Sequence, residues 1–190
     1  MLALQGDFRE HLNVLRKFGA DAVPVRRPTE LAKIDGLVIP GGESSVMDKL
    51  SRTFHLREPL IKAIQSGLPV YGTCAGMIML SKNILDGIKG QQSLGAIDIN
   101  VRRNAFGSQL DSFEVDLPIP VLGEPPLHAV FIRAPVIERV GEGVEKIATL
   151  ADGRVVAAEQ GQILVTSFHP EMTEDHRFHK YFLEKVRKAA

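Results

Sequence analysis

One segment of the chain, residues 70–80, joins an apolar run directly to a helical run. Its centre reads Gly72-Thr73-Cys74-Ala75-Gly76, which predicts a sharp strand-to-helix turn with the cysteine at its apex. The two glycines let neighbouring backbone pack where a Cβ atom would clash. Free N–H groups and partial positive charge at a helix N-terminus favour a nucleophilic thiolate. We therefore expect Cys74 to be a nucleophile, although an isolated cysteine is otherwise a small buried hydrophobic residue.

The first half of the chain alternates between strand-like and helical patterns. Strands are predicted at residues 2–5, 22–25, 36–39 and 70–73, and helices at 8–18, 28–32, 46–50 and 58–65. Residues 36–39 are continuously apolar, which is typical of a strand that is covered on both faces. The alternation predicts a three-layer α/β/α fold whose sheet is doubly wound and largely parallel.

The second half of the chain carries short strands that are separated by turns. These strands are predicted at residues 96–101, 112–115, 130–132, 146–150, 155–158 and 163–167, followed by a helix over residues 176–186. The pair Asp152-Gly153 between two apolar runs is a strong hairpin signal. This half therefore predicts antiparallel strands added to the sheet, which makes the sheet mixed.

Composition limits the classes of function. The 190 residues, 44% of them hydrophobic, fit one domain over residues 1–190. Equal numbers of basic and acidic residues, 23 each, argue against nucleic acid and anionic membranes as partners. The single cysteine excludes an internal disulfide and a multi-cysteine zinc site. Without an apolar signal segment or membrane-spanning run, we expect a cytoplasmic location.

Two further loops follow predicted strands and carry polar groups. Residues 40–44, Pro-Gly-Gly-Glu-Ser, follow one strand, and His169-Pro170-Glu171 follows another. Loops at the carboxyl ends of parallel strands meet at one edge of a sheet, where ligands bind. A spacing of two in an extended segment lets Glu171 orient His169 while His169 faces Cys74. These segments predict a Cys74–His169–Glu171 triad, and the adjacent glycines predict backbone N–H groups that face an anion.

Each of these segments has an alternative interpretation. A histidine beside a proline is often an ordinary loop residue, and His169 and Glu171 could bind zinc if a third ligand were nearby. Residues 40–44 could be a turn in which Ser44 or Ser45 caps the next helix. The remaining histidines are expected to be solvated; they are His11, His55, His128, His176 and His179.

Three motifs in chain order resemble those of class I (triad) glutamine amidotransferases: Pro-Gly-Gly-Glu-Ser at residues 40–44, Gly-Thr-Cys-Ala-Gly-Met at 72–77 and Ser-Phe-His-Pro-Glu at 167–171. Further segments narrow the resemblance to the glutaminase subunits of pyridoxal 5'-phosphate synthase. These segments are Leu4-Gln5-Gly6-Asp7, Arg103-Asn104-Ala105-Phe106-Gly107, Phe131-Ile132-Arg133-Ala134-Pro135 and residues 169–176. The resemblance covers essentially the whole chain and implies the flavodoxin-like fold of class I enzymes.

The resemblance also implies an activity and a set of site residues. Cys74 would attack the side-chain amide of L-glutamine, His169 would transfer protons and Glu171 would orient His169. The implied glutamine-binding residues are Gly42, Glu43, Ser44, Arg103, Ile132 and Arg133. The N–H groups of Gly42 and Ala75 would form the oxyanion hole, and no cofactor or metal is implied.

The resemblance implies a partner as well. Ammonia would pass to a synthase protein of the PdxS/SNZ type, which is a (β/α)₈ barrel, within a hetero-oligomer. Because Gly41-Gly42 can flip a peptide, the oxyanion hole could form only when the partner docks. Relatives carry several residues before the segment that matches residues 2–5, so we expect an unusually short first strand.

Three rival functions are compatible with parts of the pattern. The first is a glutaminase subunit for imidazole glycerol phosphate synthesis, which shares the triad and differs in its partner. The second is a stand-alone hydrolase or stress-response protein on a similar fold. The third is a non-enzymatic interaction protein with Cys74 in its core.

Overall fold

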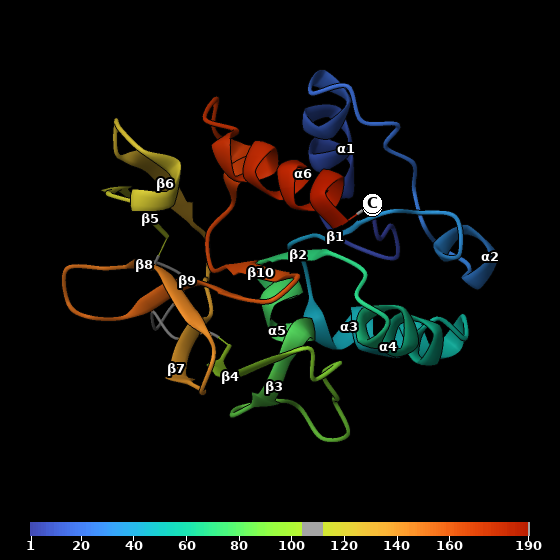
Figure 1. Ribbon diagram of the computed structural model, residues 1–190. Helices are drawn as coiled ribbons and strands as arrows, with labels where there is room; N and C mark the ends of the chain where they lie inside the picture. The colour runs from blue at the N-terminus through green and yellow to red at the C-terminus, as the bar shows by residue number, and fades with distance from the viewer. Residues whose placement is uncertain (104–111, 190) are drawn as a thin grey trace.

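The computed structural model describes residues 1–103 and 112–189. It arranges them in three layers, with a central sheet between two groups of helices (Figure 1). The elements in chain order are α1 (Phe8–Lys17), α2 (Pro28–Leu31), β1 (Leu37–Ile39), α3 (Ser44–Thr53), α4 (Arg57–Gln65), β2 (Val70–Thr73), α5 (Ala75–Leu80), β3 (Ser81–Ile84), β4 (Ile97–Arg102), β5 (Phe113–Leu117), the 3₁₀ turn η1 (Pro120–Leu122), β6 (Leu127–Phe131), β7 (Val136–Val140), β8 (Glu145–Thr149), β9 (Val155–Gln160), β10 (Ile163–Thr166), the 3₁₀ turn η2 (Pro170–Met172) and α6 (Arg177–Ala189).

The central sheet has the order β1-β2-β10-β9-β7-β4-β3, with β8 paired to β9. Strands β1, β2 and β10 run parallel to one another, whereas β9 is antiparallel to β10, β7 and β8. The hairpin predicted at Asp152-Gly153 is confirmed by the β8–β9 pair. Because β2 and β10 are parallel neighbours, the loops after them leave the same edge of the sheet.

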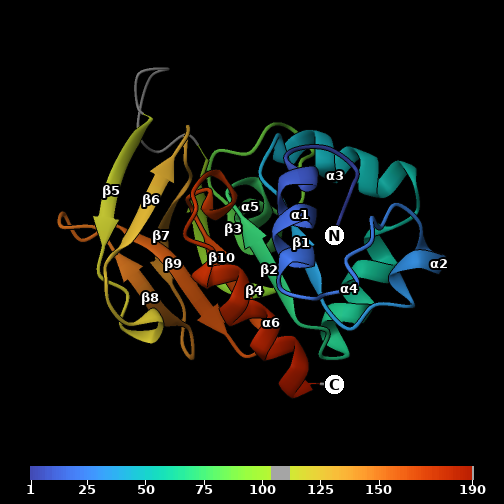
Figure 2. The same cartoon turned by 90° about the horizontal axis from the view of Figure 1, so that it is seen from above.

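Each face of the sheet is covered by its own group of helices. Leu37 and Ile39 of β1 pack in one apolar cluster with residues of α3, α4 and α5. Val38, which points to the opposite face, packs in a second cluster with residues of α1 and α6. Figures 1 and 2 show α1 and α6 together on one side of the sheet and α3, α4 and α5 on the other. The unbroken apolar pattern of β1 is explained by this double coverage.

A separate two-stranded sheet, β5–β6, lies beside the α6 face. Its inward side chains belong to the second apolar cluster, the one that contains residues of α1 and α6. There Phe131 stacks on Phe113 and contacts Phe168 edge to face. The backbone N–H of His169 donates to the carbonyl of Val130 at 2.9 Å. The small sheet therefore fixes the loop that carries His169.

Two predicted strands are much shorter in the structure. Residues 2–5 and 22–25 contribute only a parallel bridge between Leu2 and Val25, although Leu2 N–H also donates to Val38 O at 2.8 Å. Past Ala3 the first segment turns at Gly6, which has φ 93°, and the Gln5 side chain accepts from Glu43 N–H at 2.8 Å. The second is shortened because Ala22 O accepts two hydrogen bonds from Arg16.

Strands β3 and β7 were not predicted. β3 is polar and follows α5 without a turn, and it forms by parallel pairing with β4. Among the described residues, no helix is long and apolar enough to cross a membrane.

Candidate active site

The predicted turn at Cys74 is present between β2 and α5. Cys74 has φ 48° and ψ −105°, a conformation that is costly for a residue with a side chain and that concentrates at functional sites. Its N–H donates to Thr166 O of β10 at 2.8 Å, which fixes the turn to the sheet. A Cβ atom on Gly76 would lie 2.1 Å from the carbonyl oxygen of Ile39. Only glycine therefore lets the first turn of α5 pack this closely on β1.

His169 and Glu171 lie just past β10, as predicted. The Nδ1 atom of His169 is 2.7 Å from Oε1 of Glu171, and both side chains are almost fully buried. Burial by itself would lower the pKa of His169, but hydrogen bonds to Cys74 and Glu171 and the charges of these two groups raise it to about 10. The imidazole therefore lies between the thiol and the carboxylate, and its protonated form is stabilised. This arrangement suits a thiolate–imidazolium pair.

The loop over residues 40–44 lies against both the triad and α3. A Cβ atom on Gly41 would lie 2.6 Å from Cε1 of His169, so the imidazole ring packs directly on this glycine. Gly42 has φ 138°, which favours glycine. The helix cap is Glu43, whose side chain accepts from Ser45 N–H at 3.2 Å. The interpretation of Ser44 or Ser45 as the cap is therefore wrong, because both belong to the first turn of α3.

A cavity of about 330 Å³ brings most of the predicted site residues together. Its lining comprises Asp7, Gly42, Glu43, Ser44, Cys74, Ile78, Arg103, Ile132, Arg133 and His169. Glu171 contacts this lining through His169, and Ala75 follows Cys74 at the start of α5. The volume is at the small end of the range for ligand sites, which suits a single amino acid. Asp7 and Ile78 were not predicted as site residues, and residues 104–107 of the Arg103 motif lie outside the described part of the chain.

Arg103 is held in place by two acceptors. Its Nη2 donates to Oε1 of Glu43 at 3.0 Å, and its Nη1 donates to Oε1 of Gln91 at 3.1 Å. The amide nitrogen of Gln91 donates to Ser44 Oγ at 2.9 Å. Gln91 thus links two predicted glutamine-binding residues, although no motif in the sequence indicated it. Its only sequence signal is its position in the loop between β3 and β4.

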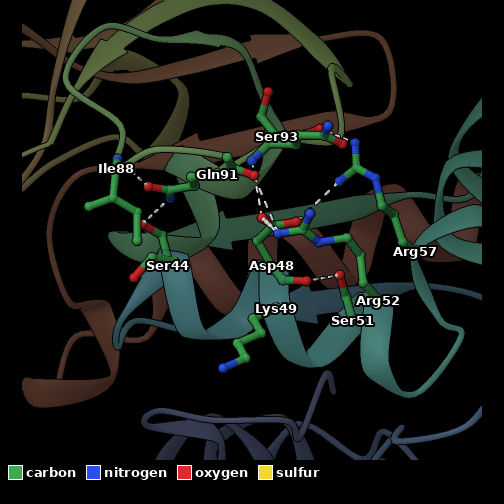
Figure 3. Close-up of polar contacts among 12 residues, drawn as sticks. Ser44, Asp48, Lys49, Ser51, Arg52, Arg57, Ile88, Gln91 and Ser93 are labelled. Carbon is green, nitrogen blue, oxygen red and sulfur yellow. Dashed lines mark hydrogen bonds and ion pairs between the residues drawn. The ribbon is translucent and has the colours of Figure 1, made fainter.

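The loop that carries Gln91 is anchored on a buried carboxylate of α3 (Figure 3). Asp48 is fully buried, and its oxygens accept from Arg52 at 2.6 Å, from Arg57 at 3.5 Å and from the N–H of Gln92 at 3.1 Å. Arg57 also donates to Ser93 O at 2.7 Å. Asp48 therefore fastens the loop, including Gln91, to the helix that begins at the cavity.

The expectation that the remaining histidines are solvated is wrong for two of them. His11 and His179 are fully buried, and Nδ1 of His11 lies 2.8 Å from Nε2 of His179. His176 is half-buried, whereas His128 is exposed between Asp116 and Glu114. The sequence did contain a signal, because His11 falls among the apolar positions of α1 and His179 follows Phe178 on α6.

A third possible zinc ligand, Asp7, lies near His169 and Glu171, but the hydrogen bond between these two residues opposes metal binding. Asp7, His169 and Glu171 present ligand atoms within 4.8 Å of one another. However, Nδ1 of His169 and Oε1 of Glu171 already share a hydrogen bond at 2.7 Å. A metal ligand needs a free lone pair on that nitrogen, so binding would require this hydrogen bond to break. The geometry favours the triad.

Comparison with known proteins identifies a family. A model of the SNO glutamine amidotransferase family matches residues 1–188. Pyridoxal 5'-phosphate synthase subunit PdxT of Leifsonia xyli subsp. xyli is 65% identical over 186 residues, 98% of this chain and 94% of that protein. PdxT of Clavibacter michiganensis subsp. michiganensis is 62% identical over 189 residues, 100% of this chain and 90% of that protein.

Solved structures agree with this result. A crystal structure of a glutamine amidotransferase has a TM-score of 0.91 at 48% identity, and it covers 98% of this chain and 97% of its own. A putative GMP synthase protein from Thermoplasma acidophilum has a TM-score of 0.69 at 18% identity, covering 98% and 92%, and shows the shared fold alone. The predicted flavodoxin-like fold of class I glutamine amidotransferases is confirmed.

Proposed function

Because the chain belongs to the SNO glutamine amidotransferase family, we propose that it is the glutaminase subunit of a pyridoxal 5'-phosphate synthase. It hydrolyses L-glutamine to L-glutamate and supplies the ammonia to the synthase subunit. The observation that carries the assignment is the hydrogen-bonded series Cys74–His169–Glu171 at the wall of the 330 Å³ cavity. A cysteine with a histidine partner, and a carboxylate that orients the histidine, is the arrangement that activates a thiol for acyl transfer.

The reaction follows from these positions. The thiolate of Cys74 attacks the amide carbon of glutamine, and His169 transfers a proton to the departing nitrogen. Ammonia leaves and a γ-glutamyl thioester remains on Cys74. His169 then takes a proton from water, which attacks the thioester and releases glutamate. One glutamine and one water thus give one glutamate, one ammonia and one proton, and Glu171 holds His169 in orientation throughout.

The cavity supplies groups for each end of glutamine. A guanidinium binds a carboxylate well, and Arg133 makes no ion pair with any described residue. Glu43 carries the negative charge that suits the α-ammonium group. Arg103, which is itself held by Gln91, fixes the position of Glu43. Gly42, Ser44 and Ile132 complete the binding surface.

The oxyanion hole consists of the N–H groups of Gly42 and Ala75 in this proposal, and partner binding completes it. The Gly41 carbonyl accepts from Asp7 N–H at 3.2 Å, and the Glu43 N–H donates to Gln5 at 2.8 Å. A flip of the Gly41–Gly42 peptide would break the first bond and turn the Gly42 N–H. Docking of the synthase near Gln5 and Asp7 would then switch on hydrolysis only where ammonia is used.

The partner in this proposal is a (β/α)₈-barrel synthase subunit of the PdxS type. The two proteins form a hetero-oligomer in the cytoplasm. The names of the relatives favour this pathway over imidazole glycerol phosphate synthesis, because they specify one subunit of pyridoxal 5'-phosphate synthase.

The test is glutamate release from glutamine by the protein alone and with its cognate synthase subunit. We expect low activity alone, a large rise with the synthase, and a loss of at least ~10³-fold in Cys74→Ala. Full activity without the synthase would support glutamine hydrolysis by Cys74 and would contradict its activation by the docked partner. No activity in any mixture, or stimulation by a different synthase instead, would contradict the proposed function.

A further inference from the structure

Two buried histidines, His11 and His179, take no part in the reaction described above; His11 lies next to Glu171, at the carboxylate oxygen that does not bind His169, and His179 contacts His11. His11 belongs to α1 and His179 to α6, and neither side chain reaches solvent. Their rings are 5.0 Å apart between centroids, and Nδ1 of His11 is 2.8 Å from Nε2 of His179. Burying two polar rings is costly unless their nitrogens have partners. Their location behind Glu171 points to a role for the pair.

The catalytic carboxylate has one oxygen that depends on His11. Oε1 of Glu171 binds His169, whereas Oε2 is buried and has no hydrogen bond of good geometry from any described residue. The ring nitrogen Nε2 of His11 lies 3.3 Å from that Oε2 and 3.2 Å from Thr73 Oγ1. A buried carboxylate oxygen requires a donor. His11 Nε2 is placed to supply it through an N–H shared with Thr73.

The protonation state of the pair follows from burial. Burial lowers the pKa of His11 well below its usual value, and the charges of His179, His169 and the chain's N-terminus lower it further. Burial and then the charge of His176 lower the pKa of His179 to about 3. Both rings are therefore neutral at neutral pH, and each carries one N–H.

The hydrogen bonds then fix which nitrogen is protonated. Nδ1 of His179 has no partner among the described residues. A bare lone pair is less costly there than an unpaired buried N–H, so the proton of His179 belongs on Nε2, which donates to His11 Nδ1. His11 must then carry its proton on Nε2, facing Glu171. Nε2–H of His179 thus donates to Nδ1 of His11, and Nε2–H of His11 points toward Oε2 of Glu171. His169 donates to Oε1 of the same carboxylate.

We propose that His11 is a positioning residue for the triad: its Nε2–H holds Oε2 of Glu171, and His179 fixes the tautomer that makes this possible. The proposal rests on the proposed function, because Glu171 matters only if it orients a catalytic His169. Second-layer partners of this kind keep a catalytic group within the narrow range of productive geometry.

The test compares two substitutions at one position. The amide of glutamine can place an N–H where His11 Nε2 is, whereas the shorter amide of asparagine falls nearer Nδ1. In the complex with the synthase, we expect His11→Asn to lower kcat by about tenfold to a hundredfold while KM for glutamine stays within about twofold. His11→Gln should recover most of the loss. His128→Asn, at an exposed site, is the control for substitution itself.

A second readout separates this proposal from the proposed function. Alkylation of Cys74 by iodoacetamide in the protein without its partner reports the thiolate and requires no glutaminase turnover. We expect His11→Asn to slow alkylation at least about threefold at pH 7, because a displaced Glu171 stabilises the imidazolium of His169 less well. General loosening of the fold would instead expose Cys74 and speed up alkylation.

The outcomes are distinguishable. If the wild-type complex releases no glutamate, the proposed function fails, and alkylation alone decides the role of His11. Slower alkylation in His11→Asn that is restored in His11→Gln supports the positioning role. Unchanged or faster alkylation overturns it. Full kcat in His11→Asn, or equal losses of kcat and thermal stability in both variants, also overturns it.

Discussion

Two arginines face the candidate cavity, and their surroundings give them different tasks. Arg103 is 13% exposed and bridges Glu43 and Gln91 with separate nitrogens of its guanidinium. Arg133 has φ 44°, which holds its backbone in a strained turn at the rim, and it forms no ion pair with a described residue. Arg103 is therefore held by two other cavity side chains, whereas Arg133 is the arginine that we propose for the carboxylate of the substrate.

Replacement of Arg103 by lysine should weaken the binding of glutamine. An ammonium is a point charge and cannot reach two acceptors in the fixed directions of a guanidinium. Glu43 or Gln91 would lose its anchor, and glutamine would bind a less ordered site. We expect KM for glutamine to rise about tenfold, the equivalent of one charged hydrogen bond, with kcat within about threefold. Steady-state glutaminase kinetics of the synthase complex measure both.

The matched control is Arg102→Lys. Arg102 is the adjacent residue, is 47% exposed and pairs with Glu138 of β7, and it is not among the residues that line the cavity. Its replacement should leave KM unchanged. An equal effect of the two substitutions, or a fall in kcat with KM unchanged in Arg103→Lys, would contradict the assigned role.

At the scale of elements, the buried carboxylate of Asp48 joins α3 to the loop between β3 and β4. Asp48→Ala would remove the carboxylate that accepts from Arg52, from Nη1 of Arg57 and from the N–H of Gln92 (Figure 3). Removal of one partner of a buried ion pair costs about 3–5 kcal/mol; because Arg52 is 45% exposed and can return to water, we expect about 3 kcal/mol. Urea unfolding measures the loss.

Asp152→Ala provides the comparison for Asp48. Asp152 pairs with Arg154 in the exposed β8–β9 turn, where solvent screens the interaction. Its replacement should change the free energy of unfolding far less than Asp48→Ala does. Similar losses in the two variants would show that Asp48 does not anchor the loop.

The sequence predicts a strand, helix or turn well where neighbouring residues alone determine it. The apolar run of β1, the glycine-flanked turn at Cys74 and the hairpin between β8 and β9 were all predicted in place. Strand β3, with the sequence Ser-Lys-Asn-Ile, carries no such signal and exists because β4 pairs with it. Tertiary pairing overrides local preference in such strands.

The residues of the candidate site also fall into two groups, those that the local sequence pattern predicts and those that depend on tertiary contacts. Residues that follow strands, such as Cys74 and His169, could be placed at one edge from the fold pattern alone. Gln91 and Asp48 could not, because their roles depend on contacts between α3 and a loop more than 40 residues further along the chain. Residue type alone does not decide the burial of His11, because histidine is intermediate between buried and exposed residue types, and its position among apolar residues of α1 is the signal that indicates burial.

At the scale of the whole molecule, α1 and α6 lie side by side on one face of the sheet (Figure 2). They are joined through His11 and His179, which are 168 positions apart in the sequence. Because η2, with Glu171, precedes α6 directly, the packing of these two helices also supports the triad. Conditions that separate α1 from α6 should therefore weaken the whole fold and the site together.

Low pH should weaken the contact between α1 and α6, because it protonates buried His179. The variant His179→Phe measures how much of the acid sensitivity comes from this residue. Burial lowers the pKa of folded His179 from 6.5 to about 3, so below pH 6.5 the unfolded chain binds a proton that the folded chain does not. Stability must then fall with decreasing pH between about 6.5 and 3, by about 1.4 kcal/mol per pH unit for this residue. His179→Phe keeps an aromatic ring beside Tyr71 and removes the titration. Urea unfolding at pH 7.5, 6.5 and 5.5 should give a shallower loss of stability in the variant.

The control for this prediction is an exposed histidine whose pKa shifts in the opposite direction. His128→Asn should not flatten the slope, because hydrogen bonds to Asp116 and Glu114 raise the pKa of His128 and its proton favours the folded state. Equal slopes in His179→Phe and the wild type would mean that His179 accepts a proton without separating the helices. The contact between α1 and α6 would then tolerate a charge, and acid would have to weaken the fold at another place.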